Sequence, residues 1–176
     1  MVPCGVRLLV FGCAPVDADA APRSALTTMA AALGARGHDV ALIWHTPRWA
    51  SALPLGEHAV GPAVLRRVLA PAELDPCLVA AAFAGIAQAA LRDVVRATSP
   101  DAVVLHADDA PTLAADPPHP QLLVVDDAAA AHAATPAGLA QLEAWAAAGH
   151  AAVEAWRATP PAAPARRLRL EAAPRP

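Results

Sequence analysis

The chain has 176 residues, of which 56% are hydrophobic, and it carries a formal net charge of −3. The hydrophobic content excludes general disorder, and the length suits a single domain with a sizeable core. The charge leaves no basic face for nucleic acid, and no stretch reaches the roughly 18 to 20 strongly apolar residues that a membrane span requires.

The three cysteines, Cys4, Cys13 and Cys77, share neither a metal-binding nor a disulfide spacing. Buried free thiols in a reducing compartment fit this pattern, so we expect a cytoplasmic protein. An arginine cluster lies within residues 166–169. We interpret it as a solvated strand or tail, and contact with phosphate or with an anionic membrane surface is the open alternative.

The first three predicted elements are a strand, a helix and a parallel strand. Residues 6–11 form an almost continuous apolar run, which predicts a strand covered on both faces. Apolar residues then recur at helical spacing from a start marked by Ser24 or Pro22. Gly37 ends this helix, and residues 40–44 form the second apolar run. A right-handed crossover is expected for such a unit.

The next stretch predicts a loop, a strand and a long helix. Residues 51–62 are rich in proline and glycine, which indicates a surface loop. Residues 63–69 predict a strand at a sheet edge, where arginines reach water. A broad apolar stripe predicts a helix over residues 76–98, which ends before Pro100.

Two further buried strands follow, at residues 101–106 and 121–125, with a loop containing one helical turn between them. Thr135 is a good helix cap and predicts a helix from Pro136. Residues 150–156 either prolong this helix or form a short strand.

Alternating strands and helices predict an α/β fold, a Rossmann-like three-layer sandwich with a mostly parallel sheet. We predict one domain over residues 1–158. Residues 159–176 then form a linker rich in proline and arginine, a short strand at residues 167–170 and a loose C-terminal tail. In this architecture ligands bind outside the carboxyl ends of the strands.

Four segments, in this order, resemble the N-terminal domain of GT-B fold glycosyltransferases, in particular the family 4-like enzymes. They are residues 33–42 (LGARGHDVAL), 99–106 (SPDAVVLH), 142–153 (LEAWAAAGHAAV) and 167–170 (RLRL). The resemblance implies half of a GT-B fold, the half that holds the acceptor. It also implies transfer of a hexose from a nucleotide-sugar donor.

The departures from that family concern function. Residues 16–23 carry two aspartates where the family has a glycine pair that approaches the ligand. Asp126 stands where the family has a histidine. We also expect the second domain, which in the family holds the nucleotide-sugar, to be missing. We therefore expect no catalysis by the chain alone and no tightly bound cofactor. The chain is either a truncated or degenerate remnant or a half that needs a separately encoded donor-domain protein, and a sugar acceptor is the other expected partner.

The candidate site residues lie mostly at the ends of predicted strands. Asp126 is the candidate general base or acceptor contact, because a carboxylate there can take a proton or accept a hydrogen bond. His106, Asp108 and Asp127 are the candidate substrate contacts, and a solvated loop that caps a helix start is the alternative for the aspartates.

Gly12 and Arg23 are two further candidates for the site, and a metal site and a second function remain to be considered. Gly12 ends the first strand, and Arg23 could pair with an anionic ligand near the first helix. The aspartates could also hold Mg²⁺, but the resembled family does not generally hold a metal this way, so we predict no metal site. The alternative function is a non-catalytic Rossmann-like binding or interaction module that uses Trp44, Trp49 and Trp156.

Overall fold

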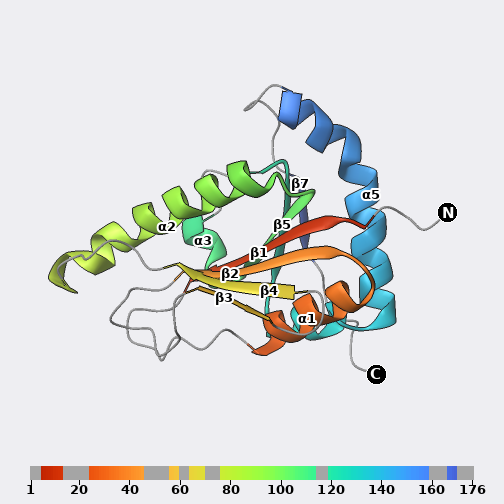
Figure 1. The fold of residues 1–176 in the computed structure, drawn as a ribbon, viewed down its shortest axis with the longest axis horizontal. Coiled ribbons are helices and arrows are strands. Elements are labelled where there is room, and N and C mark those ends of the chain that lie inside the picture. Colours follow the sequence, from red (N-terminus) through yellow and green to blue (C-terminus); the bar gives the residue numbers. More distant parts are fainter. Residues whose placement is uncertain are drawn as a thin grey trace.

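The computed structural model describes residues 5–13, 24–45, 56–59, 64–69, 76–113, 119–158 and 166–169. Strands and helices alternate along these ranges, except that the second, third and fourth strands follow one another, as do the last two helices (Figure 1). The strands are β1 (Arg7–Cys13), β2 (Asp39–His45), β3 (Gly56–Ala59), β4 (Val64–Leu69), β5 (Ala102–His106), β6 (Gln121–Val125) and β7 (Arg166–Arg169). The helices are α1 (Ser24–Ala35), α2 (Pro76–Thr98), α3 (Ala110–Leu113), α4 (Asp127–Ala133) and α5 (Pro136–Ala158).

The seven strands form one sheet in the order β3-β4-β2-β1-β5-β6-β7. All neighbouring strands run parallel except β3 and β4, which are antiparallel. Without β3, the order is that of a Rossmann fold, in which the chain first builds one half of the sheet outward and then returns to build the other. The predicted fold class, a Rossmann-like sandwich with a mostly parallel sheet, is confirmed.

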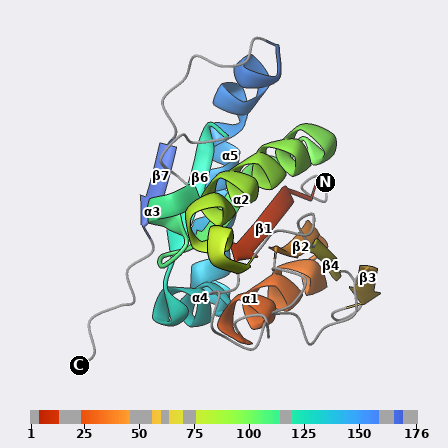
Figure 2. The same ribbon diagram turned by 90° about the vertical axis from the view of Figure 1, so that its left-hand side faces the viewer.

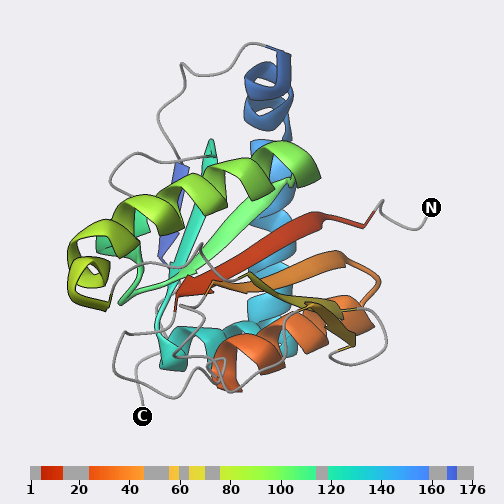
Figure 3. The ribbon, with the colours of Figure 1, turned by 60° about the vertical axis from the view of Figure 1, so that its left-hand side comes forward.

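Helices cover both faces of the sheet (Figures 2 and 3). Alternate residues of β1 serve the two faces, because successive side chains of a strand point in opposite directions. Leu8 and Val10 pack in the core cluster that contains residues of α1, α4 and α5. Leu9 and Phe11 pack in the second cluster, with residues of α2 and α3. The continuous apolar run of β1 is therefore explained by burial on both sides.

The structure corrects two predictions of local structure and decides between two alternatives at a third position. The predicted loop at residues 51–62 contains β3, so β4 lies inside the sheet and not at its edge. Helix α4 was not predicted as a separate element, because an alanine run carries no apolar periodicity. The alternative at residues 150–156 resolves as helix, since α5 continues to Ala158.

The long helix α2 spans the predicted residues 76–98 and ends before Pro100. Ser99 adopts a positive φ of 45°, which is uncommon for a residue other than glycine. Its carbonyl accepts hydrogen bonds from the side chains of Arg7 and Arg157, at 3.3 Å and 2.8 Å. No described helix is both long and apolar enough to cross a membrane.

Candidate functional site

The site predicted at the carboxyl ends of the strands falls at the centre of the sheet. β1 and β5 are neighbours there, with Phe11 opposite Leu105. The chain leaves β1 toward α1 on one face of the sheet and leaves β5 toward α3 on the other. Such a switch point opens a crevice outside the strand ends, and Rossmann-like proteins bind ligands in it.

His106, the last residue of β5, lies at this switch point. It is buried, with only 3% of its surface exposed. Its Nδ1 accepts a hydrogen bond from the backbone N–H of Asp108 at 3.2 Å. Because Nδ1 accepts, the neutral ring carries its proton on Nε2. Nε2 lies 3.5 Å from Oδ1 of Asp127 on the neighbouring segment, so the ring proton faces that carboxylate.

The two aspartates after β6 have different surroundings. Asp126 is the N-cap of α4: its Oδ1 accepts a hydrogen bond from the backbone N–H of Ala129 at 2.7 Å. This is the helix-capping role that we gave as the alternative. Asp127 is in the first turn of α4, and its side chain is 69% exposed.

A second exposed carboxylate completes the described part of the site. The side chain of Asp108 is 68% exposed, and its Oδ2 lies 3.6 Å from Nδ1 of His106. The structure therefore brings together His106, Asp108 and Asp127, with Asp126 beside them in the chain. The two exposed carboxylates can accept a hydrogen bond or a proton from a hydroxyl, and only that of Asp127 faces the protonated nitrogen of the ring.

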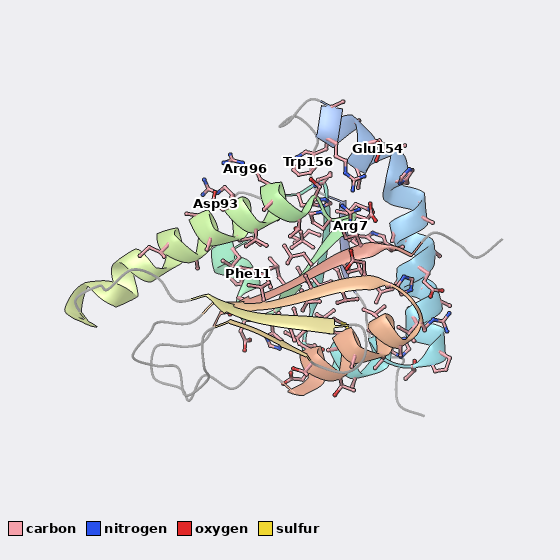
Figure 4. The ribbon with its side chains drawn as sticks, in the orientation of Figure 1. Arg7, Phe11, Asp93, Arg96, Glu154 and Trp156 are labelled. Atoms are coloured by element: carbon pink, nitrogen blue, oxygen red, sulfur yellow. The ribbon has the colours of Figure 1, made fainter. Side chains whose placement is uncertain are left out.

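The other predicted site residues are placed as follows. Gly12 is buried in β1, next to β2, with Trp44 opposite it in the register. Arg23 and Trp49 lie outside the described residues. Trp156 is partly buried and packs against the core beside His119, with ring centroids 4.9 Å apart (Figure 4). Within the described ranges no group of three or more His, Cys, Asp or Glu side chains is arranged so that it could hold a metal ion.

The phrase Arg36-Gly37-His38 lies at the opposite, amino-terminal edge of the sheet. Gly37 has a φ of 88°, the left-handed conformation that ends α1. Arg36 forms a bidentate pair with Glu143 of α5, at 2.9 Å and 3.1 Å. Nε2 of His38 also donates to Glu143 at 2.9 Å, while Nδ1 accepts from the N–H of Val6 at 3.2 Å. We call this cluster the Glu143 clasp.

The Glu143 clasp changes the pKa of its carboxyl group. The hydrogen bond from Arg36, followed by that from His38, holds the pKa of Glu143 below its ordinary value. The sequence predicts a helix stop at this phrase and gives no sign of its acidic partner. Glu143 lies 107 residues from Arg36, and sequence spacing cannot indicate such a contact.

A groove of about 850 Å³ lies at this amino-terminal edge, between α5 and the starts of the strands. Its charged side chains already have protein partners: Glu143 is in the clasp, Arg157 pairs with Asp101 at 2.9 Å, and Arg7 lies 3.7 Å from Asp39. We keep the carboxyl-end site as the candidate functional site, because ligands of Rossmann-like proteins bind outside the carboxyl ends of the strands.

A comparison with models of known protein families finds no match to this sequence, and a comparison with curated proteins finds no significant similarity. The resemblance to one half of a glycosyltransferase rests on the four segments named above, and it stays a prediction.

Proposed function

We propose that this chain is the acceptor-side half of a GT-B-type glycosyltransferase. The half is inactive by itself and transfers a hexose once a donor-binding domain faces it. The observation that carries the proposal is the site at the switch point, where buried His106 lies between the exposed carboxylates of Asp108 and Asp127. The segments that resemble the family support it, because they fall on the α1–β2 turn, β5, α5 and β7.

The negative charge at this edge of the sheet favours binding of the acceptor over binding of the nucleotide-sugar donor. Two aspartates with exposed side chains, Asp108 and Asp127, follow β5 and β6. Their carboxylates repel the diphosphate of a nucleotide-sugar and accept hydrogen bonds from neutral hydroxyls. An uncharged sugar acceptor therefore suits this side of the cleft. The diphosphate requires cationic or helix-terminal groups on a second domain.

Binding to the isolated chain tests the proposal. The ¹⁵N-labelled chain is titrated with methyl α-D-glucopyranoside, methyl α-D-mannopyranoside and UDP-glucose, and amide chemical shifts are recorded by NMR. A methyl glycoside should shift residues 106–109 and 126–132, with a dissociation constant in the millimolar range. UDP-glucose should shift those amides less than methyl α-D-glucopyranoside does, because the carboxylates at this edge repel its diphosphate.

An assay for catalysis by the isolated chain is the second test, and the expected result is no activity. Incubation with radiolabelled nucleotide-sugars and an acceptor should release no labelled product. Turnover in the absence of a second domain would contradict the proposal, and so would glycoside-induced shifts confined to the groove beneath α5.

A further inference from the structure

We infer that the contact between the start of β1 and the α1–β2 turn is a pH-sensitive switch: protonation of His38 releases the backbone of Val6 and widens the groove beneath α5. We call this contact, which Gly5 and Val6 make with Gly37 and His38, the β1 joint. The switch is independent of the proposed function, because the β1 joint lies at the amino-terminal edge of the sheet and the candidate site at the carboxyl edge.

The β1 joint extends the pairing of β1 with β2 by one residue. The regular register begins with Arg7 opposite Asp39. One residue earlier, the carbonyl of Val6 accepts from the N–H of Asp39 at 3.1 Å, as a strand residue does. The N–H of Val6 donates instead to a side chain, Nδ1 of His38, at 3.2 Å. The imidazole therefore takes the place of a strand carbonyl as the acceptor for this backbone group.

Close packing leaves the β1 joint little room to adjust. A Cβ at Gly5 would lie 2.4 Å from the carbonyl oxygen of Gly37, so the two backbones are in direct contact. The side chain of His38 is only 9% exposed. The cavity beside the ring, which Val6 and Glu143 also line, has a volume of about 10 Å³, no more than one water molecule needs. The ring therefore has no free space into which it could turn away from Val6.

Protonation of His38 has opposite effects on the two sides of the ring. On one side, Nε2 donates to Oε1 of Glu143 at 2.9 Å, and a positive charge on the ring adds an ion pair to this hydrogen bond. On the other side, Nδ1 gains a hydrogen that points at the N–H of Val6, so two donors face each other and their hydrogen bond is lost. The ring therefore stays with Glu143, and Val6 moves away.

The histidines are the groups of this region that change charge near neutral pH, because the ordinary pKa of histidine lies within about pH 5 to 8. Glu143 also accepts two hydrogen bonds from Arg36, and its lowered pKa keeps it ionised over this range. The other charged or titratable side chains that line the groove are Arg7 of β1, Asp39 of β2, Asp101 before β5, and His150 and Arg157 of α5. Carboxylates and guanidinium groups keep their charges between about pH 7.5 and 5.5.

Release of the β1 joint changes the groove and leaves the sheet intact. Gly5 and Val6 line the groove, so their departure from the turn widens it. Arg7 stays in place, because its N–H donates to Asp101 at 2.8 Å and the register of β1 with β2 begins there. The movement therefore stops at the first residue of β1.

Amide exchange of Val6 in the full chain tests the switch. Exchange with solvent is measured by NMR at about pH 7.5 and 5.5, on either side of the ordinary pKa of histidine. The reference is the rate of the same amide in the urea-unfolded chain at each pH. The protection of Val6 relative to this reference should fall at least fivefold on acidification. The side-chain ¹⁵N shifts of His38 should change from the Nε2–H tautomer to the doubly protonated ring over the same interval.

Two substitutions of His38 separate the two ring nitrogens. The amide oxygen of His38→Asn replaces Nδ1 as the acceptor for Val6 and does not titrate, so protection should change less than twofold between the two pH values. The amide nitrogen of His38→Gln replaces Nε2 as the donor to Glu143, but the acceptor for Val6 is lost, so Val6 should exchange without protection at both. His150→Asn is the control, because His150 is exposed on α5, and it should respond as the wild type does.

Three results would contradict the switch. The first is a ring of His38 that becomes doubly protonated while the protection of Val6 stays unchanged, since the ring would then have a structural role only. The second is a ring that remains neutral at the lower pH. The third is a pH response that persists in His38→Asn or disappears in His150→Asn. The proposed function is tested separately, by the glycoside-induced shifts at residues 106–109 and 126–132.

Discussion

The imidazole of His119 is the most deeply buried titratable side chain among the described residues, with 1% of the residue exposed. Its Nδ1 accepts from the N–H of Gln121 at 3.0 Å, and Nε2 lies 2.9 Å from the carbonyl oxygen of Pro100. These contacts fit the neutral ring with its proton on Nε2. Burial is the main cause that lowers the pKa of His119 below 6.5, the ordinary value of a histidine.

This lowered pKa predicts acid sensitivity. The unfolded chain binds a proton at His119 near pH 6.5, and the folded chain does so only at lower pH. The contribution to stability is therefore complete above pH 6.5 and is lost as the pH falls toward the folded-state pKa. Urea unfolding at a series of pH values measures it. His119→Gln should lose less stability than wild type on acidification, and equal losses would assign the acid sensitivity to other groups.

Gly138 illustrates a close approach of two helices. A Cβ at this position of α5 would lie 2.2 Å from the carbonyl oxygen of His132 and 2.7 Å from the Cα of Ala133, both in α4. These are backbone atoms, so they cannot move aside as the end of a flexible side chain can. The sequence signal at Gly138 is weak, because a glycine inside a helix is ordinarily just a poor helix former.

We predict that Gly138→Ala destabilises the protein by about 1–3 kcal/mol, the usual cost of overpacking. Gly85→Ala in α2 is the control, because a Cβ there meets no atom within 4 Å. The control should be stabilised by roughly 0.5–1 kcal/mol through helix propensity. Chemical denaturation of both variants measures the difference, and a neutral Gly138→Ala would mean that α4 and α5 can move apart at no cost.

At the scale of elements, α5 is attached at two points to the amino-terminal edge of the sheet. The Glu143 clasp holds its middle to the α1–β2 turn and to the start of β1. Arg157, near its end, donates to the carbonyl of Ser99 at 2.8 Å and to Asp101 at 2.9 Å. Helix α5 is thus tied to segments that begin three different strands: β1, β2 and β5.

A double-mutant cycle tests the clasp. Arg36→Ala, Glu143→Ala and the double variant should show a favourable coupling in thermal unfolding at neutral pH, because the pair is bidentate and shares His38. The lowered pKa of Glu143 means that its contribution is complete above pH 4.5 and is lost as the pH falls through the folded-state value. The coupling should therefore weaken as the pH falls below 4.5 and be lost once Glu143 is protonated in the folded state.

The pair Asp93–Arg96 provides a control for that cycle. Both side chains project from α2 away from the sheet, more than 75% exposed, with 3.9 Å between the charged atoms (Figure 4). Exposed pairs of this kind contribute little, so the same cycle there should give no measurable coupling. Equal couplings at the two positions would indicate that the shared contact to His38 adds nothing.

The elements predicted correctly from the sequence are those with a strong apolar periodicity or a continuous apolar run. Helix α2 and strand β6 have the predicted bounds, and β5 is one residue shorter. Strand β3 was missed because Gly56–Ala59 has no strand-forming residues, and pairing with β4 makes it a strand. At the site, both His106 and Asp127 were predicted from the rule that ligands bind at the carboxyl ends of parallel strands, and they lie close together in the structure. The different roles of Asp126 and Asp127 depend on backbone angles that no residue pattern specifies.

At the scale of the whole molecule, β1 and β5 are buried at the centre of the sheet, whereas β7 lies at its edge. All five residues of β5 are buried, and Leu9 and Val10 of β1 are fully buried. β7 is an edge strand of four residues. Hydrogen exchange at the central strands should require global unfolding, while β7 exchanges through local opening. Native-state exchange measured by NMR should therefore show amides of β1 and β5 at least 100-fold slower than those of β7, and uniform protection would contradict this order.

The long spans of the central contacts have a consequence for how the protein is made. The N–H of Arg7 at the start of β1 donates to Asp101, 94 residues later in the chain, and Arg36 meets Glu143 after 107 residues. At 5–20 residues per second, roughly 5 to 20 s pass on the ribosome before β1 meets β5. During that interval the apolar edge of β1 has no β5 to pair with. A nascent chain stalled before β5 should therefore be held by a chaperone, and release should follow emergence of α5.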